Sequence, residues 1–177
     1  MHNDIEKVLL SEKEIQEICC NLGSRITDDY KDKSLILIGL LKGCNPFLSD
    51  LSKRINLPLE IYYMKASSYK GRESSGNVKI DLDIDIDIKD KDVLLVEDIV
   101  DTGSTLTKVI SLLKMRKASS IKVVSLLDKP EGRLVPFEAD YVGKTIPKVF
   151  VVGYGLDFNE RYRNLPYIGI LKKAIYI

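Results

Sequence analysis

The sequence is poor in the residues on which many catalytic and metal-binding sites depend. It has three cysteines, and Cys19, Cys20 and Cys44 are an odd number without paired spacing. This pattern provides neither a disulfide framework nor a zinc-binding signature, so we expect reduced thiols. The one histidine is His2, close to the N-terminus, and a cysteine–histidine catalytic pair is therefore not expected.

Long apolar runs and an excess of either charge are missing as well. No apolar run is long enough to span a bilayer. The formal net charge is +1, which gives no electrostatic reason to expect binding to nucleic acid or to a membrane. Residues 1–7 are polar and acidic, unlike a secretory signal, so we expect a cytoplasmic protein.

Strand-like and helix-like segments alternate along the chain. Ser11 and Glu14 have the spacing of a capping box, and an apolar stripe follows them at helical period. Helices are predicted at residues 11–29, 47–55 and 105–117, and strands at residues 34–41, 59–64, 78–88, 93–96, 121–127 and 148–152. This alternation indicates an α/β fold with a mostly parallel central sheet and helices on both faces.

The chain has no internal repeat or linker, and its length suits a single domain over residues 1–177. Residues 66–76 lack periodicity and are rich in Ser and Gly, which predicts a long loop of the kind that often covers a site. The aspartates of residues 78–88 are interpreted as the solvated face of a strand rather than as a metal site. Residues near the N-terminus and residues 128–177 are expected to form a small lobe over the site.

The segment from Val93 to Leu106 carries the clearest chemical signal. An apolar strand leads through Glu97 and Asp98 into a turn of small and hydroxyl-bearing residues, and then into a helix. Ligands of open α/β sheets bind beyond the carboxyl ends of the strands, and helix N-termini hold phosphates. The segment therefore predicts a phosphate pocket made by Thr102, Gly103, Ser104 and Thr105.

The two acids allow more than one interpretation. Glu97 and Asp98 could accept hydrogen bonds from a sugar diol, or they could hold Mg²⁺ through water. The plainer alternative is a helix cap beside two solvated carboxylates. Neither the Walker spacing nor the dinucleotide-binding glycine pattern is present, so the ligand favoured here is a phosphorylated sugar.

The same segment resembles that of a known enzyme family. Residues 93–106 are similar to the phosphoribosyl pyrophosphate-binding motif of type I phosphoribosyltransferases, in the form found in the hypoxanthine-guanine branch. Two positions depart from the family pattern, because Val149 stands where lysine is usual and Lys144 where an aromatic is common. Further similarity covers most of the chain and involves the pyrophosphate loop 41–43, the closing loop 68–69, residues 127–130, the base-stacking segment 150–157 and the C-terminal signature 159–166.

The resemblance implies a type I phosphoribosyltransferase fold with a small purine-binding lobe, and a magnesium-dependent reaction. In that reaction, 5-phosphoribose passes from phosphoribosyl pyrophosphate to N9 of a 6-oxopurine, hypoxanthine or guanine. The resemblance also implies a cis peptide between Leu41 and Lys42. It assigns pyrophosphate binding to Leu41, Lys42, Gly43 and Arg163, closure of the site to Ser68 and Tyr69, and purine binding to Lys129, Phe150, Val151 and Asp157.

Several of these implied roles compete with simpler ones. Asp101 is implied as general acid or base at purine N7, but it could also cap the following helix. Lys129 is implied as a donor to O6, although a lysine after a strand is usually solvated. Phe150 is implied to stack on the purine, although it could belong to the core. Asp157 is implied as a magnesium ligand, with Glu97 and Asp98 holding a second ion, although it could serve only a turn.

Other functions remain open from the sequence. An RNA-binding regulator that keeps the fold would need a basic face, which this nearly neutral chain does not show. Lys129 disfavours adenine as substrate, and Phe150 with Asp157 disfavours orotate, whereas xanthine remains an alternative. The expected partners are small-molecule substrates, and the resemblance implies a homodimer or a homotetramer.

Overall fold

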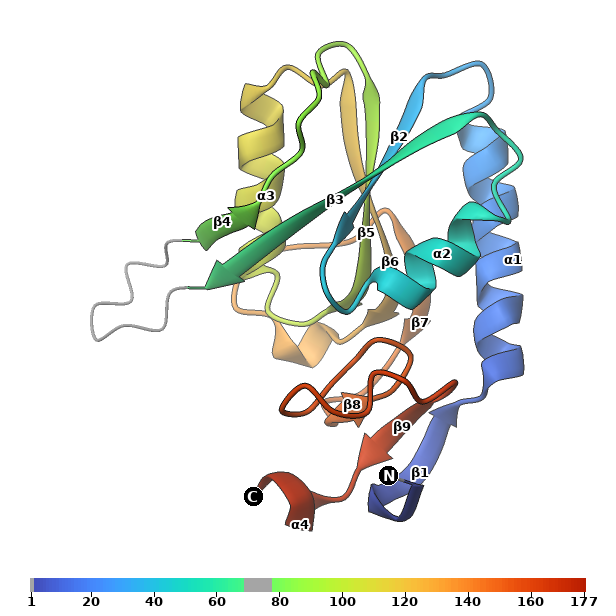
Figure 1. Cartoon of the computed structure of the whole chain (residues 1–177), viewed down its shortest axis with the longest axis vertical. Coiled ribbons are helices and arrows are strands. Elements are labelled where there is room, and N and C mark those ends of the chain that lie inside the picture. Colours follow the sequence, from blue (N-terminus) through green and yellow to red (C-terminus); the bar gives the residue numbers. More distant parts are fainter. Residues whose placement is uncertain (1, 69–77) are drawn as a thin grey trace.

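A twisted sheet forms the centre of the molecule (Figure 1). The computed structural model describes residues 2–68 and 78–177, and within them six strands pair in the order β4-β3-β2-β5-β6-β7. All are parallel except β4, which is antiparallel to β3 at one edge, so the expected α/β class is confirmed. The strands are β2 (Leu35–Leu40), β3 (Leu59–Ser68), β4 (Val78–Leu82), β5 (Asp92–Val100), β6 (Ser120–Asp128) and β7 (Tyr141–Thr145).

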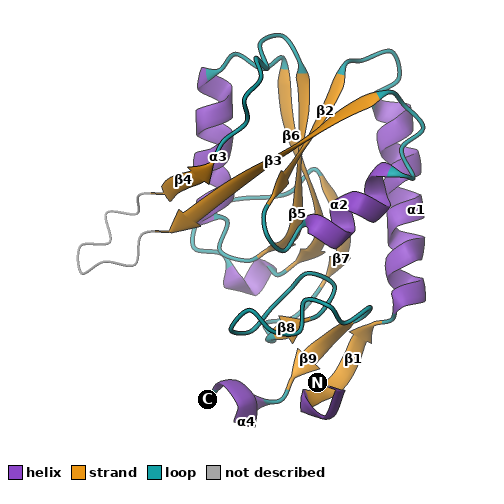
Figure 2. Cartoon of the chain, in the orientation of Figure 1, coloured by secondary structure: helices purple, strands orange, loops and turns teal. Residues whose placement is uncertain are grey.

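Helices cover both faces of this sheet (Figure 2). Helices α1 (Glu12–Asp29) and α2 (Asn45–Ser52) pack on one face, and α3 (Ser104–Met115) packs on the other. Strand β2 is buried on both sides, since its alternate residues belong to two different apolar clusters. No helix among the described residues is long and apolar enough to cross a membrane.

The start of α1 shows how local sequence sets an element. The Glu14 amide donates to Ser11 Oγ at 3.3 Å, and the Ser11 amide donates to Glu14 Oε2 at 2.8 Å. These two bonds are the capping box that the sequence predicts, and they satisfy amides that have no partner inside the helix.

A second sheet joins the two ends of the described chain. Its order is β1-β9-β8, all antiparallel, and Figure 1 shows it beside the carboxyl ends of the central strands. Tyr154 Oη donates to Asp50 of α2 at 2.7 Å, which attaches the segment after β8 to the main body. The elements here are the 3-10 helix η1 (His2–Asp4), β1 (Ile5–Leu10), β8 (Val151–Val152), β9 (Ile168–Leu171) and α4 (Lys173–Tyr176), and a further 3-10 helix, η2 (Pro130–Gly132), follows β6.

Residues 78–88 are not one strand, so that prediction is wrong beyond Leu82. Pairing with β3 ends there because Asp83 accepts a hydrogen bond from the Ile84 amide and forms an ion pair with Arg116. Ile84 and Ile88 still point into the core, but Leu82 is exposed, so the apolar alternation predicts burial correctly for only part of the segment. Without the ladder to β3, the same alternation does not make a strand.

Other predicted boundaries also need correction. Strand β3 runs to Ser68 through residues predicted as loop, because β4 pairs with this extension. Strand β8 is only Val151–Val152, shorter than the predicted 148–152. Strands β1, β7 and β9 were not predicted, since each is an edge strand or belongs to the small sheet and carries little apolar periodicity.

Candidate active site

The carboxyl ends of β2 and β5 meet where the acids of the predicted sugar site lie. The prediction that Glu97 and Asp98 follow the strand is wrong, because β5 continues to Val100 by pairing with β6. Pairing with β2 stops earlier, at Gly39↔Val96. Both acids therefore lie on the part of β5 that extends past the end of β2.

The loop after β2 fills the space beside these acids. The peptide bond between Leu41 and Lys42 is cis, as the family resemblance implies. A Cβ atom on Gly43 would lie 1.6 Å from Asp98 Oδ2, so only glycine allows the loop to approach the carboxylate this closely. The main chain of residues 41–43 is thus pressed against the acid pair.

Negative charge on the Glu97 and Asp98 carboxylates is unfavourable in the protein alone, as their raised pKa values indicate. Burial raises the pKa of Glu97 well above its usual range, and the neighbouring Asp98 charge raises it further. Burial also raises the pKa of Asp98 to about 6, although the Ile99 amide partly offsets this by donating to the carboxylate. Glu97 Oε2 is buried without a hydrogen-bond partner among the described residues. The pair is therefore suited to groups that a ligand brings, such as hydroxyls or a cation.

The turn after β5 forms a cleft at the start of α3. Gly103 occupies the N-cap position with φ of 79°, and no side chain caps the helix. The helix-cap role considered for Asp101 is therefore wrong. The cleft has a volume of about 170 Å³ and lies at a helix N-terminus, which favours an anion because the first amides of a helix have no helical partner. Its lining residues are Glu97, Ile99, Asp101, Thr102, Gly103, Thr105 and Leu106.

Asp101 and Lys129 are in direct contact although they lie far apart in the sequence. Val100 of β5 pairs with Asp128 of β6, so the next residue of each strand emerges at the same place. Lys129 Nζ lies 2.5 Å from Asp101 Oδ2, and the two side chains are 13% and 44% exposed. The sheet therefore places an acid and a cation side by side at the edge of the cleft.

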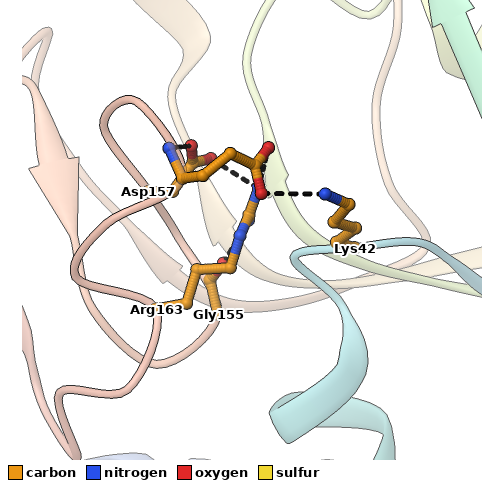
Figure 3. A network of polar contacts seen from close by, with 5 residues as sticks. Lys42, Gly155, Asp157 and Arg163 are labelled. Atoms are coloured by element: carbon orange, nitrogen blue, oxygen red, sulfur yellow. Dashed lines mark hydrogen bonds and ion pairs between the residues drawn. The ribbon is translucent and has the colours of Figure 1, made fainter.

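A second group of charges links the β2 loop to the segment after β8 (Figure 3). Lys42 Nζ lies 2.8 Å from Glu160 Oε2, and Arg163 Nη2 lies 3.2 Å from Glu160 Oε1. Arg163 also contacts Asp157 at 3.0 Å and donates to the Gly155 carbonyl at 2.6 Å. The Lys42 ammonium, followed by the Arg163 guanidinium, holds the pKa of Glu160 below its usual range.

The aromatic side chain expected to stack on a base lies in a small aromatic group. Phe150 is partly exposed and stacks on Tyr176 of α4, with ring centroids 4.8 Å apart. Phe158 meets Phe150 edge-on at 5.7 Å. Val151, the neighbour of Phe150, points the other way and is buried in the main core.

The structure places the residues singled out from the sequence in several smaller groups of contacts. Ser68 ends β3, in the extension that pairs with Val78 of β4. Tyr69 lies outside the described residues. Sequence reasoning missed Glu160, Arg133 and Tyr176, because a charged or aromatic residue in an aperiodic segment gives no sign of its spatial neighbours.

Known proteins resemble this chain over most of its length. Residues 7–159 match the family model described as the phosphoribosyl transferase domain. The chain is 54% identical to the hypoxanthine-guanine phosphoribosyltransferase of Staphylococcus aureus, and the match covers 99% of each chain. It is 55% identical to the bifunctional protein TilS/HprT of Listeria innocua, but it spans only 27% of that longer protein.

Solved structures of related enzymes share the fold of this chain. A crystal structure of a hypoxanthine phosphoribosyltransferase from Staphylococcus aureus superposes with a TM-score of 0.97 at 53% identity, covering 100% of this chain and 97% of that one. A hypoxanthine phosphoribosyltransferase from Trypanosoma cruzi superposes with a TM-score of 0.94 at 41% identity, covering 99% and 100%. The chain belongs to the phosphoribosyl transferase domain family.

Proposed function

We propose that the protein transfers 5-phosphoribose from phosphoribosyl pyrophosphate to N9 of hypoxanthine or guanine, in purine salvage. The bond from ribose C1′ to pyrophosphate breaks, the bond from C1′ to N9 forms, and the purine loses one proton. The products are inosine or guanosine monophosphate and pyrophosphate. The curated relative that matches this chain over its full length carries the name of this activity.

The observation that carries this proposal is the contact between Asp101 and Lys129 beside the phosphate cleft. On a 6-oxopurine, O6 and N7 lie on one edge of the ring system, so one donor and one acceptor are needed side by side. Lys129 would donate to O6, and Asp101 would take the proton from N7. The base must separate this ion pair when it binds, and Phe150 would stack on its face.

The remaining charged groups suit the sugar and its leaving group. Glu97 and Asp98 would accept from the ribose hydroxyls, and residues 102–105 would hold the 5′-phosphate at the start of α3. Lys42 and Arg163 would bind pyrophosphate, together with the main chain of Leu41 and Gly43. Tyr69 with Ser68 would close over the site and exclude water.

Magnesium fits the donors at this edge of the sheet. Glu97 Oε2 has no hydrogen-bond partner among the described residues, and Asp98 and Asp157 offer further carboxylate oxygens. No cluster of three or more His, Cys, Asp or Glu side chains that could hold a metal ion is found in the described part of the chain. Proteins commonly bind Mg²⁺ through one or two carboxylates together with substrate oxygens and water. When bound, Mg²⁺ would neutralise charge that develops on the leaving pyrophosphate.

The direct test measures initial rates with hypoxanthine, guanine, xanthine and adenine under the same concentrations of phosphoribosyl pyrophosphate and Mg²⁺. We expect turnover of hypoxanthine or guanine and none of adenine. Faster turnover of xanthine than of hypoxanthine and guanine would identify the protein as a xanthine-preferring phosphoribosyltransferase. Absence of turnover with all four bases would contradict the proposal, and RNA binding by the inactive protein would then point to a regulator that keeps the fold.

We also propose that residues 1–177 act as one domain in which the three-stranded sheet serves as the purine-binding lobe. The attachment of Tyr154 to Asp50 and the link from Lys42 to Glu160 support this arrangement. As with the enzymes it resembles, we expect a homodimer or homotetramer, which light scattering of the purified protein would establish.

A further inference from the structure

A single arginine joins the two strand ends that carry Asp101 and Lys129. Arg133 Nη1 donates to the Val100 and Asp101 carbonyls, at 2.7 Å each, and is 3.3 Å from the Lys129 carbonyl. Its Nη2 pairs with the Asp128 carboxylate, and its Nε donates to the Phe137 carbonyl at 3.0 Å. The Arg133 side chain is 15% exposed, so these bonds form largely out of water.

This arrangement matters because the sheet no longer aligns the two residues. The ladder between β5 and β6 ends at Val100↔Asp128, and one further bond runs from the Lys129 amide to the Val100 carbonyl. Beyond that bond, the carbonyls of Asp101 and Lys129 are both held by Arg133. The guanidinium therefore replaces the missing ladder at the point where the reactive side chains begin.

We infer that Arg133 is the positioning residue that sets the spacing of Asp101 and Lys129 for the O6–N7 edge of the purine. The inference rests on the proposed function. Arg133 itself touches main-chain carbonyls and Asp128, and acts on the base only through the two residues that it aligns. The sugar acids Glu97 and Asp98 lie earlier on β5, where its ladder to β6 is still intact, and the proposed pyrophosphate residues lie in the loop after β2 and in the segment after β8. These sites therefore do not depend on Arg133 in the same way.

Only a guanidinium can make this set of contacts. Its planar fork directs donors in three directions, with Nη1 toward the carbonyl cluster, Nη2 toward Asp128 and Nε toward the Phe137 carbonyl. An ammonium group at this position keeps the charge but is a single point with three donors. Arg133→Lys should therefore keep the charge balance near Asp128 and lose the alignment.

The test compares Arg133→Lys with Arg116→Lys, a matched control in which another partly buried arginine, the C-cap of α3, loses its paired hydrogen bonds to the Asp83 carboxylate. We expect Arg133→Lys to lower kcat/KM for hypoxanthine about 100-fold, since a misplacement near 1 Å has this effect. The KM for phosphoribosyl pyrophosphate should change less than about threefold. Arg116→Lys should leave both constants unchanged.

Each outcome decides the matter. Full kcat/KM for hypoxanthine in folded Arg133→Lys, or equal losses for both substrates, would overturn the inference, because a merely structural role affects both. If this variant does not fold, Asp128→Asn loosens the same guanidinium more gently, and an unchanged kcat/KM for hypoxanthine there would also overturn it. If the wild-type protein has no transferase activity, both the proposed function and the inference are contradicted. If the wild type is active, a negative result with the variants contradicts only the role of Arg133.

Discussion

At the scale of single residues, Asp101 had two possible roles, and the structure separates them. Gly103 is the N-cap of α3, so Asp101 is not needed to begin the helix. Its partner is instead Lys129, on the neighbouring strand end. A carboxylate that pairs with a cation at the edge of a cleft, and serves no helix, is well placed to accept a proton from a ligand.

Replacing Asp101 by asparagine should therefore affect chemistry more than sugar binding. We expect Asp101→Asn to lower kcat by roughly 100-fold or more, the usual contribution of a general base. Affinity for phosphoribosyl pyrophosphate, measured by calorimetry, should stay within about threefold of wild type. Asp85→Asn, at an exposed carboxylate, is the control. An unchanged kcat in Asp101→Asn would remove this residue from the mechanism.

Asp98 predicts a pH dependence of stability. Its pKa is raised from 3.8 to about 6 by burial, so between these values the folded protein keeps a proton that the unfolded chain has lost. The contribution of Asp98 to the free energy of unfolding therefore falls as pH rises through this window. Asp98→Asn should match the wild type near pH 3.5 and be more stable by about 3 kcal/mol at pH 7, since each pKa unit corresponds to about 1.4 kcal/mol.

Urea unfolding of wild type and Asp98→Asn between pH 3.5 and 7.5 would measure this difference. Carboxylates with lowered pKa values, such as Asp83, contribute to the pH dependence of stability with the opposite sign. Their contributions are the same in both proteins and cancel when the two free energies of unfolding are subtracted. A stability difference that is constant across the range would contradict the prediction.

At the scale of elements, the β2 loop and the segment after β8 are connected through Glu160. Each of its oxygens contacts a different cation, Lys42 or Arg163 (Figure 3). These are the cations assigned to pyrophosphate. On the proposed assignment, the Glu160 carboxylate would compete with pyrophosphate for these two cations.

Glu160→Gln should strengthen the binding of magnesium pyrophosphate, because the ligand no longer has to displace a charged competitor. The effect should be modest, about threefold, since exposed ion pairs are weak. It should shrink at high salt, where surface charges are screened. Glu17→Gln, which removes an exposed pair with Lys13 on α1, is the matched control. Weaker binding in Glu160→Gln would mean that Glu160 orders the two cations instead of competing for their ligand.

At the scale of the whole molecule, both ends of the chain support the aromatic group that includes Phe150. Tyr176 stacks on Phe150, and it packs in one apolar cluster with Ile5 of β1. The small sheet thus joins residues that are about as distant in sequence as the chain allows. A residue near the C-terminus thereby contacts the ring that is proposed to hold the purine.

Tyr176→Ala should raise the KM for hypoxanthine about fivefold, because a stacked aromatic pair contributes on the order of 1 kcal/mol. The KM for phosphoribosyl pyrophosphate should not change. Tyr176→Phe keeps the ring and should behave as wild type. A lower KM for hypoxanthine in Tyr176→Ala would show that the tyrosine occupies the place of the base and does not support Phe150.

The sequence by itself determined the local elements and the chemical type of the central turn. Helix α1 follows from its capping box and apolar stripe, and the buried strands follow from short apolar runs, because these signals depend only on near neighbours. The acids and hydroxyls of residues 97–105 already indicate a phosphorylated sugar. The separate roles of Asp101 and Lys129 at the purine, however, come only from family resemblance.

Only the tertiary structure decided which of these residues meet. Residues 78–88 carry a strand pattern, yet their backbone leaves the sheet where Asp83 turns toward Arg116. The contact of Asp101 with Lys129 depends on the register of β5 and β6, and the roles of Arg133 and Glu160 depend on contacts between separate segments. Such contacts are set by packing of the whole chain, which no local pattern records.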